Sequence, residues 1–174
     1  MYVGQGALDR RTVQVAPQGN PDWRALRICR YQILEVVMRF VAGYVAFLVA
    51  FGICDAIWLG TMTARLYRPA LGDLIVEQVR YVPAALFYFG FPLGVLHFAV
   101  MPALREGNAG AAFLNGALIG LLAYATYDLT NYATLRPWTL TITLADILYG
   151  TVVVGFCSWI AYEVVRRAIG WGWL

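Results

Sequence analysis

The sequence predicts an all-α, polytopic membrane protein: a bundle of four transmembrane helices with an interfacial helix near its N-terminus. Of its 174 residues, 61% are hydrophobic and only 13% are charged, whereas soluble domains carry about half apolar and a quarter charged residues. The mean hydropathy is +0.64. Four apolar runs are long enough to cross a bilayer, which takes about 20 helical residues. Their expected ranges are 39–61, 82–104, 109–134 and 140–163.

Residues 1–37 differ from the apolar remainder and are expected to form a polar arm followed by an amphipathic helix at the membrane interface. The first twenty residues are polar and glycine-rich, a composition typical of flexible segments. In NPDWRALRICRYQILEVV, Asn20 can cap a helix, and apolar residues then recur with helical spacing opposite charged ones. Residues 38–174 form the expected transmembrane domain. The sequence leaves open that translation begins at Met38, because MRFVAGYVAFLV is typical of a membrane-protein start.

The connections between the four spans differ in length. TARLYRPALGDLIVEQVRYVP, between the first two spans, is too polar for hydrocarbon and is expected to be a short surface helix or loop. Only REGN and RPW separate the later spans, so the second, third and fourth are expected to be antiparallel neighbours. Gly90 with Gly94, and Gly116 with Gly120, have the GxxxG spacing that allows close helix contact.

The placement of the basic residues, all thirteen of which are arginine, predicts the orientation in the membrane. With a cytoplasmic N-terminus, nine arginines lie on the cytoplasmic side and four lie on the other face: Arg65, Arg68, Arg80 and Arg136. Because positive charge accumulates on the cytoplasmic side, both termini are expected to be cytoplasmic, in the inner membrane of a bacterium. The arginines form no basic stripe with stacking aromatic rings, which excludes nucleic acid as a partner.

Three aspartates, Asp55, Asp128 and Asp146, lie inside the predicted spans, where a charge costs at least about 2.5–3.5 kcal/mol at mid-helix and usually faces the bundle interior. All three are expected at similar depth toward the outer face, because the first and third spans end there and the fourth begins there. Their helix-face neighbours, three or four positions away, are Trp58, Tyr124, Asn131 and Tyr149. We therefore expect a polar pocket between these three spans.

The chemistry of this pocket is left open by the residues alone. Closely spaced carboxylates in a low dielectric cannot all stay ionised unless an arginine or a metal ion intervenes. They could bind a proton or cation, hold a divalent metal, or hydrogen-bond the helices to one another. Carboxylate oxygens suit magnesium or calcium, but no D-x-x-D spacing occurs within one helix. A metal therefore remains unassigned.

His97, the only histidine, is the residue that could ligate a pigment such as haem or chlorophyll. It falls in the inner half of the second span, away from the aspartates, and hydrogen bonding to a backbone carbonyl is the simpler interpretation. The three cysteines, Cys29, Cys54 and Cys157, have no metal-binding spacing and are expected to be buried thiols. The sequence indicates no particular cofactor.

Two motifs, DAIWLG at 55–60 and YATYDLTNYATL at 124–135, occur together with the Ala–Asp pair at 145–146. They resemble a bacterial family of predicted integral membrane proteins whose function is unknown. The resemblance covers roughly residues 38–163. It implies the four-helix architecture and the three aspartates, and it implies no established activity.

These observations favour a small integral membrane protein whose aspartate cluster binds or transports a proton, a cation or a small polar ligand. Four helices make a thin wall for a transport path, so transport would need a homodimer. An alternative is an accessory subunit of a larger membrane complex, one that could contain a pigment or cofactor, with the aspartates and GxxxG faces as structural contacts. A third is an intramembrane enzyme, for which no nucleophile with an adjacent base is visible.

Overall fold

The computed structural model describes residues 23–76 and 78–174. The chain divides into two compact units, Met1–Leu34 and Glu35–Leu174. In the first unit the described residues, 23–34, are helical, and Tyr31, Ile33 and Leu34 are exposed. The polar arm and the expected cap at Asn20 lie outside the described residues. The second unit carries the three aspartates.

The first span belongs to α1 (Trp23–Met62), and helical turns continue beyond it. A π-helical turn, η1 (Thr63–Tyr67), leads into α2 (Arg68–Leu71) and a 3₁₀ turn, η2 (Gly72–Leu74). Pro69, which has no backbone N–H to donate, lies in α2 directly after this π-helical turn. Gly72, at φ +50°, ends α2 in a conformation that favours glycine. The segment expected as a surface helix or loop is therefore helical as far as Leu74.

The second span consists of α3 (Tyr81–Val95), a π-helical turn η3 (Leu96–Val100) and α4 (Met101–Glu106), which ends at Gly107 with φ +65°. The third and fourth spans are α5 (Ala109–Thr134) and α6 (Leu140–Gly170). Asn108 caps α5 by accepting from the Ala111 N–H at 3.2 Å, and Thr139 caps α6 by accepting from the Ile142 N–H at 3.2 Å.

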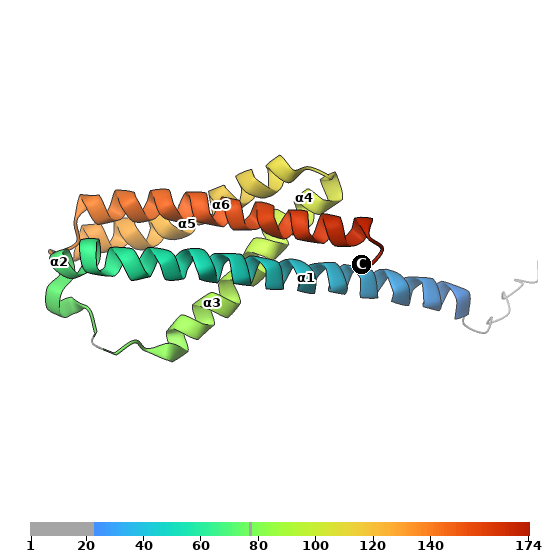
Figure 1. The fold of residues 1–174 in the computed structure, drawn as a ribbon, viewed down its shortest axis with the longest axis horizontal. Helices are drawn as coiled ribbons and strands as arrows, with labels where there is room; N and C mark the ends of the chain where they lie inside the picture. Colours follow the sequence, from blue (N-terminus) through green and yellow to red (C-terminus); the bar gives the residue numbers. More distant parts are fainter. Residues whose placement is uncertain (1–22, 77) are drawn as a thin grey trace, which may run out of the picture. The chain divides into compact units, whose positions relative to one another are not determined.

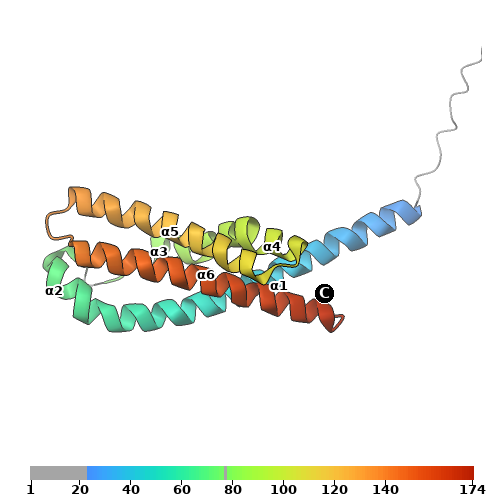
Figure 2. The same cartoon turned by 90° about the horizontal axis from the view of Figure 1, so that it is seen from above.

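Four helical stretches are long and apolar enough to cross a membrane: Arg30–Leu74, Tyr81–Glu106, Ala109–Thr134 and Leu140–Gly170. This confirms the predicted all-α class with four membrane-spanning helices. In Figures 1 and 2, α5 and α6 lie side by side along most of their length with α1 beside α6, and in Figure 1 α3 crosses obliquely. The ends of α1 and α5 and the start of α6 meet at one end of this unit (Figure 1).

Glycines allow α5 and α6 to approach closely. A Cβ on Gly116 would collide with Ser158, and one on Gly120 would collide with the backbone carbonyl of Gly150. This GxxxG pair therefore allows close contact between two helices of the same chain, as expected. By contrast, a Cβ on Gly90 or Gly94 would meet nothing within 4 Å, so packing within the described chain does not require glycine at this pair.

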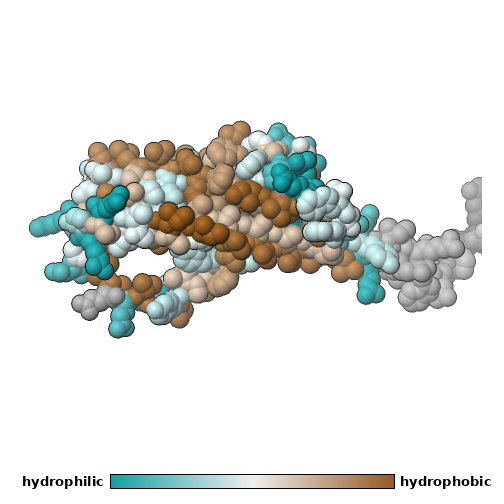
Figure 3. Space-filling model, viewed as in Figure 1, coloured by the Kyte–Doolittle hydropathy of each residue, from teal (hydrophilic) through white to brown (hydrophobic). Residues whose placement is uncertain are grey.

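The interior and the outside of this unit are both apolar. Phe47 and Phe51 of α1 are fully buried and stack at 5.6 Å, against Val95, Leu96 and residues of α6. The outside carries many exposed leucine, valine, isoleucine and phenylalanine side chains, and Figure 3 shows hydrophobic surface along the helices with hydrophilic groups gathered mainly toward the ends. Helices that face lipid present this kind of surface, whereas soluble monomers do not. The protein is therefore a small integral membrane protein.

Candidate ligand-binding site

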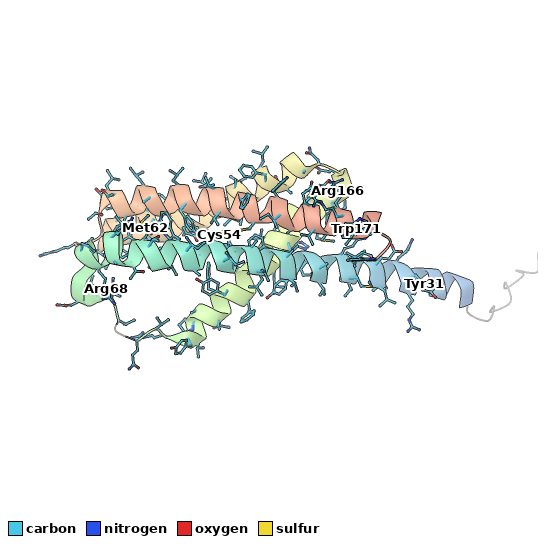
Figure 4. All side chains as sticks on the ribbon, viewed as in Figure 1. Tyr31, Cys54, Met62, Arg68, Arg166 and Trp171 are labelled. Atoms are coloured by element: carbon cyan, nitrogen blue, oxygen red, sulfur yellow. The ribbon has the colours of Figure 1, made fainter. Side chains whose placement is uncertain are left out.

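A cavity of about 530 Å³ lies between α1, α5 and α6, with further walls from α3 and from the turns that follow α1. Asp55, Asp128 and Asp146 all line it. Each stands about two helical turns from the end of its helix, which is roughly 10 Å at 1.5 Å per residue. These helix ends lie near the labelled Met62 and Arg68, and opposite the end of α6 where Arg166 and Trp171 are labelled (Figure 4). The structure thus brings the three predicted acids to one cavity at one end of the bundle.

Asp55, on α1, is held by tyrosines from two other helices. Its side chain is only 6% exposed. Tyr88 of α3 donates a hydrogen bond to Asp55 Oδ2, and Tyr149 of α6 lies at 3.5 Å from Asp55 Oδ1, a longer and weaker contact. Asp55 therefore connects α1, α3 and α6.

Asp146, on α6, is held by the turn that follows α1. It is 7% exposed, and the Tyr67 hydroxyl of η1 donates to its Oδ1. Trp58 Nε1 donates in turn to the Tyr67 hydroxyl oxygen at 2.9 Å. This relay joins α1, η1 and α6. It also explains why η1 turns toward the bundle, although its sequence predicts a surface segment.

Asp128, on α5, differs from both. Its side chain is fully buried, and neither carboxylate oxygen has a hydrogen-bond partner among the described residues. A buried polar group without a partner costs about 1–3 kcal/mol by protein mutational data, and most such groups are paired. Asp128 is therefore the one acid of the cavity whose carboxylate is held by no other residue of the described chain.

Aromatic rings form much of the cavity wall. They are Trp58, Tyr67, Phe87, Tyr124, Tyr127, Trp138 and Tyr149. The Trp58 and Tyr149 rings stack with centroids 4.1 Å apart, and Tyr127 meets Trp138 edge to face at 5.6 Å. The rest of the wall is mainly aliphatic: Leu59, Thr63, Leu71, Ile75 and Ala123. The cavity therefore combines acidic groups with apolar and aromatic surface.

Positive side chains do not reach these acids in the described part of the chain. Its ion pairs join Glu35 to Arg39, and Glu163 to Arg166 and Arg167. The four arginines expected on the outer face are all exposed: Arg65, Arg68, Arg80 and Arg136. No three histidine, cysteine, aspartate or glutamate side chains in the described ranges are grouped so as to hold a metal ion.

Two predicted site residues lie elsewhere. Asn131 is half-buried on α5 but does not line the cavity, because a three-residue step leaves a side chain some 60° around the helix from Asp128. His97 is exposed on η3, where its ring meets Phe98 edge to face at 4.7 Å, and it does not line the cavity either. Trp58, Tyr124 and Tyr149 do line it.

The threonines of the YATYDLTNYATL motif also stay out of the cavity. Thr126, Thr130 and Thr134 donate to the carbonyl oxygens four residues earlier on α5, at 2.6–2.7 Å. Their hydroxyls are thus satisfied by their own helix.

Sequence reasoning missed Tyr67, Tyr88, Tyr127 and Trp138. A signal existed for Tyr88, which lies seven residues after the start of α3 at Tyr81 and hence at the depth of the aspartates. Tyr67 carried no such signal, because its segment was too polar to be placed inside the bundle.

Comparison with models of known protein families gives a match. The model of the family described as "Predicted membrane protein (DUF2177)" matches residues 40–163. This range contains all three aspartates and confirms the resemblance drawn from the motifs. No curated protein and no solved structure matches the chain.

Proposed function

Because the chain belongs to this DUF2177 family of membrane proteins, whose function is unknown, we propose a function from the site itself. The protein binds a proton, a cation or a small polar ligand in the cavity, with Asp128 as the accepting group. The observation that carries this proposal is the fully buried Asp128 carboxylate, which has no partner among the described residues.

The hydrogen-bond partners of the three aspartates distinguish a binding role from a purely structural one. Hydrogen bonds between helical segments give Asp55 and Asp146 a structural role, since each accepts from a tyrosine of another segment. The same explanation fails for Asp128, which joins nothing in the described chain. A group that destabilises the isolated protein and lines a cavity is typical of a binding site.

The arginine distribution supports a bacterial inner-membrane protein with both ends in the cytoplasm. In that orientation the cavity lies toward the extracytoplasmic side. Binding alone needs one chain. Transport needs a second opening on the opposite side, and we assign that role to a homodimer, because the wall of a single chain is thin.

Leucine substitutions test the proposal, because leucine resembles aspartate in shape and removes every hydrogen bond. Asp55→Leu leaves Tyr88 without an acceptor, and Asp146→Leu does the same to Tyr67, so each should lower the free energy of unfolding by about 1–3 kcal/mol. Asp128→Leu removes a group without a partner and should leave stability unchanged or raise it. Reversible unfolding in mixed micelles measures all three. A loss for Asp128→Leu as large as the other two would favour the structural role.

A second candidate function is an accessory subunit of a larger membrane complex. One observation favours it: the open face at Gly90 and Gly94, where added Cβ atoms would meet nothing within 4 Å. Purification in mild detergent distinguishes the candidates. A fixed stoichiometric complex with other polypeptides, loosened by Gly90→Leu and left intact by Asp128→Leu, would support the subunit role.

A further inference from the structure

We infer that the ligand of this cavity is an amphipathic organic ammonium ion, a protonated amine whose N–H groups donate to Asp128 and whose apolar body lies against the aromatic wall. This inference rests on the proposed binding function and specifies its ligand. It follows from the charge, size, wall chemistry and unmet hydrogen-bonding capacity of the cavity.

The charge of the cavity favours a cation. Three aspartates line it, and no arginine is among the lining residues. The chain contains no lysine at all. An anion placed here would face like charges without a compensating group, whereas a cation would relieve the mutual repulsion of the carboxylates.

The size of the cavity favours an organic ion over a metal ion. Its volume of about 530 Å³ falls within the roughly 300–1,000 Å³ of typical small-molecule sites. A metal ion such as Mg²⁺ or Ca²⁺ needs several oxygen ligands converging at about 2.0–2.6 Å. No three acidic, histidine or cysteine side chains of the described chain converge in this way.

The wall favours a cation with an apolar body. Aromatic faces attract ammonium groups, most strongly where water is excluded. Trp58 and Tyr149, which stack on one another, stand three residues after Asp55 and Asp146 on their helices. Tyr127, which meets Trp138 edge to face, directly precedes Asp128 on α5, and all four rings line the cavity. Aliphatic residues complete the lining, so a ligand can bury hydrocarbon there as well as its charge.

Asp128 favours an amine that carries at least one N–H. Both of its carboxylate oxygens lack donors in the described residues, whereas Asp55 and Asp146 already accept from tyrosines. A quaternary ammonium ion would satisfy the charge but supply no N–H donor. A protonated primary, secondary or tertiary amine supplies both.

The rim of the cavity fits an amphipathic molecule. Leu59, Phe87 and Tyr127 line the cavity and are also exposed on the outside, at 43%, 43% and 60%. All three stand on helices that are apolar enough to cross the membrane. An amphipathic amine dissolved in the bilayer would reach the cavity past these side chains.

Three matched probes test the inference by calorimetry with the full chain in nanodiscs at pH 7, with empty nanodiscs as the blank. They are benzyldimethylammonium, which has one N–H; benzyltrimethylammonium, which has none; and neopentylbenzene, the neutral carbon isostere. Benzyldimethylammonium should bind about tenfold more tightly than benzyltrimethylammonium, and both should bind more tightly than neopentylbenzene. Asp128→Asn should lower the affinity for benzyldimethylammonium about tenfold or more and remove its advantage.

Three further variants guard against effects on folding. Asp73→Asn removes an acid that is exposed on η2 and outside the cavity, so it should leave all affinities unchanged. Tyr127→Phe keeps the ring and should retain binding, whereas Tyr127→Leu should weaken both charged probes. Because Tyr127 is largely exposed, either change should fold.

The outcomes separate the inference from the proposed function. If no ammonium probe binds in a way that depends on Asp128, while Asp128→Leu still leaves stability unchanged, the binding function stands and the ligand class is wrong. If Asp128→Leu destabilises the protein as much as Asp55→Leu does, the binding function and the ammonium ligand are both wrong. Equal affinity for the two ammonium probes would overturn the N–H donation to Asp128.

Discussion

Trp58 of α1 and Tyr149 of α6 stack with their ring centroids 4.1 Å apart and their planes 11° from parallel. Each ring stands three residues after an aspartate of the cavity, Asp55 on α1 and Asp146 on α6. The stack therefore fixes the two helices beside one another at the level of the carboxylates. Trp58 also donates to Tyr67, so one side chain supports both the stack and the relay to Asp146.

Substitutions of Trp58 should separate these two roles. Trp58→Phe keeps a ring for stacking but loses the N–H, and it should cost about 0.5–1.5 kcal/mol of unfolding free energy. Trp58→Ala loses both and should cost about 3 kcal/mol. Trp171→Ala, at an exposed ring near the C-terminus, serves as the control and should change stability little. Equal losses for the two Trp58 variants would show that the stack contributes nothing.

Tyr67→Phe should loosen the segment that follows α1. The variant removes the donor to Asp146 and the acceptor for Trp58, leaving polar groups of both without partners. Hydrogen–deuterium exchange read by mass spectrometry should then be faster across residues 63–74 and unchanged in α5. Tyr81→Phe, at a ring that is 81% exposed, should have no effect. Unchanged exchange in Tyr67→Phe would mean that this hydrogen bond does not hold the segment.

Glycine substitutions should have opposite effects on the two GxxxG pairs. Gly120→Ala places a methyl group against the backbone carbonyl of Gly150, which cannot turn aside, and overpacking of this kind costs about 1–3 kcal/mol. Gly90→Ala enters open space and should stabilise its helix by up to about 1 kcal/mol. Reversible unfolding measures both. A loss at Gly90 in the purified protein would point to contacts with a second chain.

Labelling of single cysteines with a membrane-impermeant maleimide should show the orientation of the protein in the membrane. In a background without the native cysteines, Arg68→Cys should be labelled in intact cells, because α2 is proposed to face outward. Trp173→Cys should be labelled only after the membrane is opened. The reverse pattern would place the cavity toward the cytoplasm.

The helices could be predicted from the sequence because each span is a long apolar run, and because only the short segments REGN and RPW separate the later ones. The three aspartates could be placed at one depth for the same reason, since the ends of the runs fix the level of each acid. Both inferences depend on local composition alone.

The partners of the acids could not be predicted in the same way. Tyr67 lies in helical turns that continue beyond α1, and its bond to Asp146 joins residues 79 positions apart, which local composition does not reveal. Tyr88 resembles the aromatic residues that commonly line membrane interfaces. Asn131 shares a helix face with Asp128 by spacing, but the packing of α5 on α6 selects a narrower strip of that face.

Isotope-edited infrared difference spectroscopy tests the central claim most directly, because it observes the carboxyl groups themselves. Spectra of protein with ¹³C-labelled aspartate, recorded with and without benzyldimethylammonium, should contain a carboxyl difference band. That band should disappear in Asp128→Asn and persist in Asp73→Asn. A band that survives in Asp128→Asn would contradict the assignment of Asp128 as the group that accepts from the ammonium ion, and no band in the unmodified protein would contradict the ammonium ligand.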